Sequence, residues 1–191
     1  MLLAAGEGSR FGRPKALVEW DGQTLAERGV GMLLAGGADP VLLVTGAVRI
    51  DLAAERRVLL VHNERWRTGM GSSLRAALLA MPPDADAAVV ALADQPLVGP
   101  EAVARLIAAG QAGAGVAVAS YEGRPRNPVL LAREHWPEVI ALAAGDQGAR
   151  AFLRARPDLV TLVECGDISR PDDIDTPADL DRIAARRPPG V

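Results

Sequence analysis

The sequence predicts a three-layer α/β domain with a mostly parallel sheet. Short apolar runs rich in Val and Leu recur through the first half of the chain, and most of them end in Gly, Asp or Asn. Helix-like stretches separate these runs, and this order of elements produces a parallel sheet covered by helices on both faces. A length of 191 residues suits one core, so we predict a single domain over residues 1–191.

The first half of the chain supplies four predicted strands and three predicted helices. The strands cover residues 2–5, 41–46, 58–63 and 87–94, and their continuous apolar character is typical of strands buried on both faces. The helices cover residues 24–35, 72–81 and 100–109. Pro100 stands at the start of the third helix, where its missing N–H costs no hydrogen bond.

The second half is less regular. Apolar runs occupy residues 115–121, 127–132 and 159–164, and helices are expected over 134–144, after a turn at 145–150, and from Thr176 onward. Pro125 and Pro128 lack backbone donors, so the stretch 124–128 is predicted to form a loop or an antiparallel edge, not the middle of a strand. Residues 186–191 are expected to form a frayed tail.

Composition excludes several functional classes. Aromatic residues make up 3% of the chain and the net charge is −3, which argues against a nucleic acid or an anionic membrane as partner. The single cysteine, Cys165, rules out an intrachain disulfide and any cysteine-rich metal site, and favours a cytoplasmic location. We find neither a run of membrane-spanning length nor a signal-peptide pattern.

The loop after the first predicted strand, GEGSRFGRPK, is a candidate anion site. Gly6 and Gly8 expose backbone N–H groups, and Arg10 and Lys15 add positive charge, so this loop can cradle a triphosphate. Its spacing matches neither a Walker loop nor the G-x-G-x-x-G dinucleotide pattern. The alternative is a flexible turn with two solvated cations.

Polar residues follow other predicted strands at the same carboxyl edge of the sheet, where ligands of such folds bind. Asp94 follows an apolar strand and can hold Mg²⁺, although an Asp before Gln-Pro can equally cap a turn. Thr45 and Asn63 belong to this edge as well. The acidic residues near position 170 are expected to form a solvated loop: Asp167, Asp172 and Asp173.

Six motifs, taken in order, resemble those of the molybdenum cofactor cytidylyltransferase family, whose opening signature reads LAAGxSxRMGxxK. They span nearly the whole chain and read LAAGEGSRFGRPKAL, NERWRTGMGSSLRAAL, ADQPLV, RNPVLL, GDQGAR and DIDTPADL. The opening is shared with sugar-phosphate and other cytidylyl- or guanylyltransferases, whereas the last two motifs narrow the resemblance. Ala5 also favours CTP, because the GTP-using enzymes carry LAGG.

The resemblance implies a three-layer αβα, Rossmann-like nucleotidyltransferase domain. It would transfer CMP from CTP to the terminal phosphate of molybdenum-loaded molybdopterin and release pyrophosphate. Mg²⁺ would be held by Asp94 and Asp175, and the catalytic residues would be Arg10, Lys15 and Asp94. The acceptor would face Asn127, Asp146 and Arg150. The nucleotide would contact Leu3, Ala4, Ala5, Gly6, Gly8, Arg10, Lys15, Gly69, Ser72 and Ser73.

The same resemblance implies as partners CTP, a molybdopterin-type cofactor, and a molybdoenzyme or its maturation chaperone. Three positions depart from the family pattern: Phe11 stands where Met is usual, Gly71 replaces a Ser, and Asn127 replaces a His. The alternatives are a nucleotidyltransferase that uses GTP or another acceptor, such as a sugar or polyol phosphate, and a non-catalytic protein that binds or delivers the molybdenum cofactor.

Overall fold

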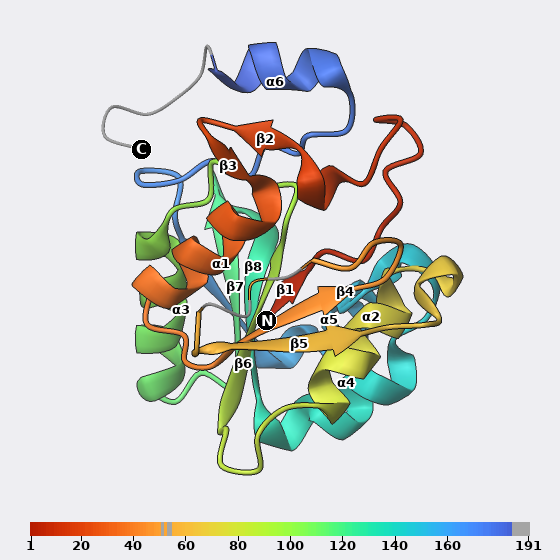
Figure 1. The fold of residues 1–191 in the computed structure, drawn as a ribbon. Coiled ribbons are helices and arrows are strands. Elements are labelled where there is room, and N and C mark those ends of the chain that lie inside the picture. Colours follow the sequence, from red (N-terminus) through yellow and green to blue (C-terminus); the bar gives the residue numbers. More distant parts are fainter. Residues whose placement is uncertain (51, 53–54, 185–191) are drawn as a thin grey trace.

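A seven-stranded sheet forms the centre of the molecule (Figure 1). The computed structural model describes residues 1–50, 52 and 55–184. The strand order is β5-β4-β1-β6-β8-β7-β9. The strands are β1 (Leu2–Leu3), β4 (Val41–Thr45), β5 (Val58–His62), β6 (Ala87–Leu92), β7 (Val116–Tyr121), β8 (Arg124–Ala132) and β9 (Val160–Glu164).

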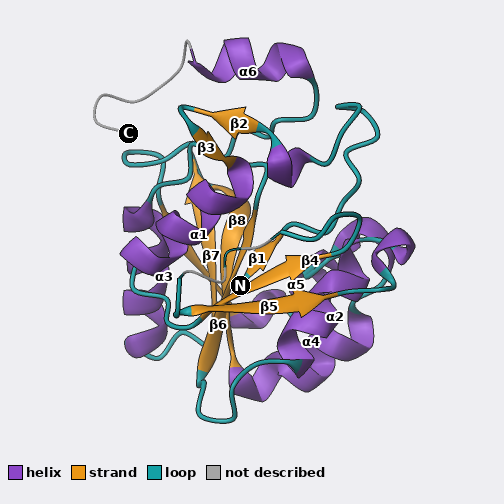
Figure 2. Cartoon of the chain, in the orientation of Figure 1, coloured by secondary structure: helices purple, strands orange, loops and turns teal. Residues whose placement is uncertain are grey.

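Helices cover both faces of this sheet, as Figure 2 shows. One face carries α1 (Leu25–Ala35) and α3 (Pro100–Gln111), and the other carries α2 (Met70–Leu79), α4 (Trp136–Leu142) and α5 (Arg150–Ala155). A last helix, α6 (Pro177–Ala184), lies at one end of the sheet beside a small hairpin of β2 (Glu19–Trp20) and β3 (Gln23–Thr24). The predicted three-layer, mostly parallel α/β fold is confirmed.

The two faces of the sheet bury alternate residues of the same strands. Leu43 and Val89 pack on the α1 and α3 side, whereas Leu42 and Val90 pack on the other side. This alternation follows from the period of two in a strand, and it explains why the central strands read as continuous apolar runs. The sheet is thereby held between two apolar layers.

Local sequence sets the start of two helices. Thr24 caps α1: its hydroxyl accepts a hydrogen bond from the Glu27 N–H, and the Glu27 carboxylate accepts one from the Thr24 N–H. This reciprocal arrangement satisfies two N–H groups that the helix leaves unpaired. Pro100 occupies the first position of α3, as predicted.

The prediction for the proline-containing stretch was partly wrong. Residues 124–128 belong to β8, which is antiparallel as anticipated but lies between β6 and β7 instead of at an edge. The sheet tolerates the prolines because β8 pairs with β6 only from Val129 to Ala132, and its pairing with β7 shifts register between Val118 and Ser120. Pro125 and Pro128 therefore fall where β6 requires no donor.

The predicted burial of residues 58–63 was also wrong. Strand β5 is an edge strand, and its Leu59 and Leu60 are 43% and 49% exposed. Among the described strands β4 alone pairs with it, so apolar character did not distinguish a central strand from an edge strand. The predicted tail at 186–191 lies outside the described residues. Within the part that is described, no helix is long and apolar enough to cross a bilayer.

Candidate active site

Three segments that are distant in sequence meet at the carboxyl ends of the parallel strands. The loop over residues 4–14 leaves β1, residues 93–99 leave β6, and residues 170–176 lead into α6 (Figure 1). The end of β1 touches the start of the second segment, because Ala93 N–H donates to the Leu3 carbonyl at 3.2 Å. The Ile174 N–H donates to the Asp94 carbonyl at 2.8 Å and ties in the third segment.

An ion cluster forms where these segments meet. The Lys15 ammonium lies 2.7 Å from Oδ2 of Asp94 and 2.7 Å from Oδ1 of Asp175. Arg10 contacts the other oxygen of Asp175 at 2.9 Å, from a side chain that is 73% exposed. The structure therefore brings together all four of the charged residues that the sequence assigned to phosphate and metal.

The charges of the cluster stabilise one another. Partial burial lowers the pKa of Lys15, but the charge of Asp94 and the hydrogen bonds to both carboxylates outweigh it, so the net shift is upward. The hydrogen bond from Lys15 lowers the pKa of Asp175. Both pKa shifts favour the charged forms of Lys15 and Asp175, as binding of a polyphosphate and a cation requires.

The backbone before α6 holds Asp175 in place. The Asp179 carboxylate accepts hydrogen bonds from the N–H groups of Asp175 and Thr176, at 2.9 and 2.7 Å, and from the Thr176 hydroxyl at 3.0 Å. A carboxylate in this position caps the helix, and its negative charge interacts favourably with the positive N-terminal end of the helix dipole. The DTPAD sequence therefore fixes the residue that carries the second carboxylate.

The chemistry of this cluster fits a divalent cation. One oxygen of Asp94 and one of Asp175 each lie 2.7 Å from the Lys15 ammonium, so both carboxylates are close enough to face a single bound ion. Mg²⁺ and Mn²⁺ prefer oxygen ligands and fill their remaining positions with water or phosphate. Among the described residues no three His, Cys, Asp or Glu side chains form a closed metal cage. An open, two-carboxylate site of this kind suits a cation that arrives with a phosphate.

The glycine-rich loop is held by its own backbone. The Gly8 carbonyl accepts hydrogen bonds from the N–H groups of Phe11 and Gly12, each at 2.9 Å. Gly8 has a φ of +67°, and a Cβ there would lie 2.0 Å from the Arg13 carbonyl oxygen. Phe11, which replaces the usual Met, packs in a small apolar cluster with Leu97 and Ile174. The loop is therefore anchored to both other segments of the site.

The remaining residues assigned to the nucleotide lie on either side of this loop. Leu3, Ala4 and Ala5 are all buried, and the Ala5 carbonyl accepts a hydrogen bond from the Ala47 N–H at 3.0 Å. Any base contact by Ala5 would use the second lone pair of that carbonyl or the methyl group.

The second predicted nucleotide loop, Gly69 to Ser73, is helical beyond its first residue, because Gly69 caps α2 and Met70 begins that helix. Buried Asn63 donates to the hydroxyls of Ser72 and Ser73, at 2.8 and 3.0 Å. The Ser72 hydroxyl in turn donates toward the Gly69 carbonyl at 2.8 Å. Both serines are thus held by the polar residue that ends β5. The position of Asn63 directly after a predicted strand was the only sequence signal that it contributes to the site.

Asn127 and Arg150 of the predicted acceptor group line one pocket, together with Leu3. Its other lining residues are mostly apolar: Met70, Leu74, Val90, Leu92, Val129, Gln147, Gly148, Ala149 and Leu153. Asp146 is not part of this lining. It lies against the nucleotide loop, where a Cβ on Gly69 would come within 2.7 Å of its Oδ1.

The backbone of α2 at Gly71 closely approaches the segment that follows α4. A Cβ on Gly71 would lie 2.6 Å from the Ala144 nitrogen, so a Ser at this position, as in the family pattern, requires the backbone at Ala143 and Ala144 to move. Gly71 is therefore compatible with a tighter packing of these segments than a Ser would permit.

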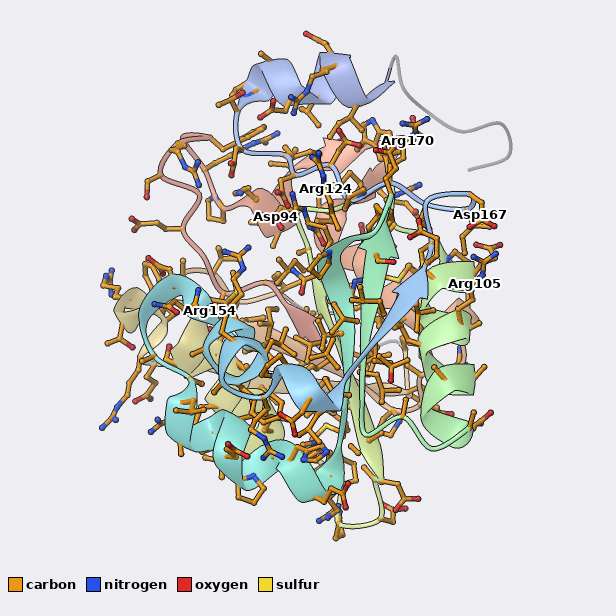
Figure 3. The ribbon with its side chains drawn as sticks, turned by 180° about the vertical axis from the view of Figure 1, so that it is seen from behind. Asp94, Arg105, Arg124, Arg154, Asp167 and Arg170 are labelled. Carbon is orange, nitrogen blue, oxygen red and sulfur yellow. The ribbon has the colours of Figure 1, made fainter. Side chains whose placement is uncertain are left out.

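Gln95 was not among the residues that the sequence assigned to the site, and the acidic loop predicted to be solvated has exposed Asp167 and Asp173 side chains that also pair with other segments. Buried Gln95 donates to Asp173 at 2.9 Å, and Asp167 forms a two-pronged ion pair with Arg105, at 2.7 Å for each contact. Figure 3 shows Arg105 and Asp167 together on α3's side of the molecule, away from Asp94. The acidic loop is therefore tied to the rest of the fold at both Asp167 and Asp173.

Comparison with known proteins identifies the fold and the reaction class. The family described as "MobA-like NTP transferase domain" matches residues 1–160. The chain belongs to this family. The match includes Arg10, Lys15 and Asp94, and it ends before Asp175. Nicotine blue oxidoreductase of Paenarthrobacter nicotinovorans is 36% identical over 201 residues, which cover 96% of this chain and 94% of that protein.

Solved structures and a further relative extend the comparison. Rv0371c of Mycobacterium tuberculosis H37Rv has a TM-score of 0.79 at 28% identity, over 96% of this chain and 95% of its own. Its complex with manganese has a TM-score of 0.71 at 26% identity, over 95% of each chain. A probable molybdenum cofactor guanylyltransferase of Opitutus terrae is 39% identical over 79 residues, 41% of this chain and 38% of that protein.

Membership of the MobA-like family confirms two of the sequence predictions. The protein is an enzyme of the nucleotidyltransferase class, and its fold is the Rossmann-like one of that class. Divalent cations are typical of the family, and one of the solved neighbours holds manganese. Because the relatives carry different names, family membership leaves the base and the acceptor open.

Proposed function

We propose that the protein transfers CMP from CTP to the terminal phosphate of molybdenum-loaded molybdopterin and releases pyrophosphate. The observation that carries this proposal is the convergence of Asp94, Asp175, Lys15 and Arg10 beside the glycine-rich loop. Two anions and two cations at one sheet edge suit a triphosphate that binds with a divalent cation. The ordered GDQGAR and DIDTPADL motifs support the cytidylyl assignment.

The proposed reaction needs no protein nucleophile. A phosphate oxygen of the acceptor attacks the α-phosphorus of CTP, and the bond from that phosphorus to the departing pyrophosphate breaks. Lys15 and Arg10 bind the phosphates and neutralise charge on the leaving group, and backbone N–H groups of the glycine loop orient them. Asp94 and Asp175 would hold Mg²⁺, which supplies further charge neutralisation at the phosphates when bound.

The acceptor would occupy the side of the site that Asn127, Asp146 and Arg150 border. The Arg150 guanidinium can bind a phosphate through two parallel hydrogen bonds, which a lysine cannot match. Asn127 enters from the start of β8, close to the end of β6, because Val129 pairs with Val90. The acceptor phosphate would therefore meet the nucleotide beside the carboxyl ends of β1 and β6, next to the first half of the antiparallel β8.

Pyrophosphate release with each nucleoside triphosphate tests the proposal. We expect release with CTP only when molybdenum-loaded molybdopterin is present, and a kcat/KM for CTP well above that for GTP. Equal or better use of GTP would contradict the cytidylyl assignment. Pyrophosphate release that depends on a sugar or polyol phosphate would show that this compound, and not molybdopterin, is the acceptor. No metal-dependent release with any acceptor, together with tight binding of the molybdenum cofactor, would favour the delivery protein.

A second candidate comes from the relative named nicotine blue oxidoreductase, since that match covers almost the whole of both chains. The only cysteine here is the buried Cys165, so a redox reaction would need a bound electron donor instead of a dithiol. Oxidation of reduced nicotinamide dinucleotide in the presence of a flat aromatic acceptor, without pyrophosphate release, would support this candidate over nucleotidyl transfer.

Replacing Lys15 and Arg150 separates the two proposed subsites. Lys15→Ala should weaken CTP binding by roughly ten- to a hundredfold, because a charged hydrogen bond to phosphate is lost. Arg150→Ala should leave the affinity for CTP, measured without acceptor, within about twofold and raise the KM of the acceptor about tenfold. Calorimetric titration with CTP and acceptor-dependent kinetics measure the two effects. Equal losses of CTP affinity in both variants would contradict the two-subsite assignment.

A further inference from the structure

Gln95 connects the two segments that carry the proposed metal ligands. It follows Asp94 directly and is only 5% exposed. Its side-chain amide donates to Oδ1 of Asp173 at 2.9 Å, two residues before Asp175. This partly buried hydrogen bond links two segments that lie 78 residues apart in the sequence.

Backbone hydrogen bonds flank this link on both sides. The Ile174 N–H donates to the Asp94 carbonyl at 2.8 Å, and the Arg170 N–H donates to the Leu97 carbonyl at 3.1 Å. Leu97 and Ile174 are fully buried in one apolar cluster. The two segments are therefore paired over several residues, and Gln95 supplies the side-chain contact of that pairing.

The far side of the Gln95 loop is held as well. Arg28 of α1 donates from Nε to the Pro96 carbonyl at 2.9 Å, and its guanidinium stacks 4.5 Å from the ring of Trp20. This contact holds Pro96, the residue after Gln95, against α1. Lys15 bridges the two carboxylates, and the side chain of Gln95 joins the backbone segments that carry them.

We propose that Gln95 is a positioning residue that holds Asp94 opposite Asp175 in the geometry a divalent cation requires. This inference rests on the proposed function, which makes the two aspartates the metal ligands. An amide suits the task because it donates to Asp173 without adding charge. A Lys would offer a second ammonium to the carboxylates, and a Glu would repel Asp173. Outer contacts of this kind commonly govern metal affinity.

Reversing the donor and the acceptor tests the link. In Gln95→Glu two carboxylates face each other, whereas the double variant with Asp173→Asn lets the new amide donate to the new carboxylate. Asp173→Asn alone keeps an acceptor oxygen for Gln95. Binding of Mn²⁺ with a non-hydrolysable CTP analogue, followed by the electron paramagnetic resonance of free Mn²⁺, gives a readout that does not depend on turnover.

We expect the Mn²⁺ dissociation constant to rise at least about tenfold in Gln95→Glu and to return to within about threefold of wild type in the double variant. The Mn²⁺ dissociation constant of Asp173→Asn alone should stay within about threefold of the wild-type value. That of Gln95→Met, which has a similar size, should fall between the values of wild type and Gln95→Glu. Arg105→Met is a matched control. It removes the ion pair of Arg105 with Asp167, another link to the segment after β9, and should leave Mn²⁺ affinity unchanged.

Two outcomes would overturn the inference in distinguishable ways. If wild type binds Mn²⁺ with the analogue and Gln95→Glu binds it equally well, or the double variant is no better than Gln95→Glu, Gln95 does not position the ligands. If wild type itself shows neither nucleotide-linked Mn²⁺ binding nor metal-dependent pyrophosphate release, the proposed function fails and the inference fails with it. Thermal unfolding of each variant separates loss of metal affinity from loss of fold.

Discussion

Asp94→Asn and Asp175→Asn should each lower metal-dependent turnover by about a hundredfold or more, and each variant should remain folded. The two carboxylates face the same ammonium at 2.7 Å, and removing either charge leaves a divalent cation with half of its protein ligands. Loss of a group that stabilises charge in phosphoryl transfer costs roughly 3–4 kcal/mol, which corresponds to this change in rate.

Pyrophosphate release over a range of Mg²⁺ concentrations measures this effect. Asp167→Asn is the matched control, because Asp167 pairs with Arg105 outside the site, and its turnover should equal that of wild type. Near-wild-type turnover of Asp94→Asn or Asp175→Asn at saturating Mg²⁺ would show that the altered residue is not a metal ligand. Far-UV circular dichroism and the Tm check that each variant is folded.

Gly8→Ala should disable the glycine-rich loop, whereas Gly6→Ala should leave its structure intact. The Cβ in Gly8→Ala would lie 2.0 Å from a backbone oxygen, at a φ of +67° that L residues rarely adopt. A Cβ at Gly6 meets nothing within 4 Å. The strained backbone alone costs about 1–3 kcal/mol, and relief of the contact must move the chain near Arg13 and Lys15.

Thermal unfolding and nucleotide titration measure both parts of this prediction. For Gly8→Ala we expect a Tm lower by several degrees, at about 2–4 °C per kcal/mol for a chain of this size, and at least about tenfold weaker CTP binding. The Tm of Gly6→Ala should match that of wild type. Equal Tm values for the two variants would mean that the close approach at Gly8 does not constrain the loop.

The sequence predicted the layered fold because helix and strand periods are local properties. Capping at Thr24, Pro100 at a helix start, and the apolar runs of β4 and β6 each follow from neighbouring residues. Burial of a whole strand is not local. The runs 41–46 and 58–63 look alike, yet β4 has neighbours on both sides and β5 has one, which the sheet order alone decides.

The family resemblance assigned Arg10, Lys15, Asp94 and Asp175 to one site, and the strand pattern supported this for Asp94 and the glycine-rich loop, since residues after parallel strands share one edge of a sheet. What only the tertiary structure decided is how these groups pair. Lys15 joins carboxylates 79 and 160 residues away, and Gln95 reaches Asp173 across 78 residues. Such contacts depend on three segments being folded together at ångström precision. Sequence spacing therefore determined which chemistry is present, and the packing of Leu97, Ile174 and Phe11 determined its geometry.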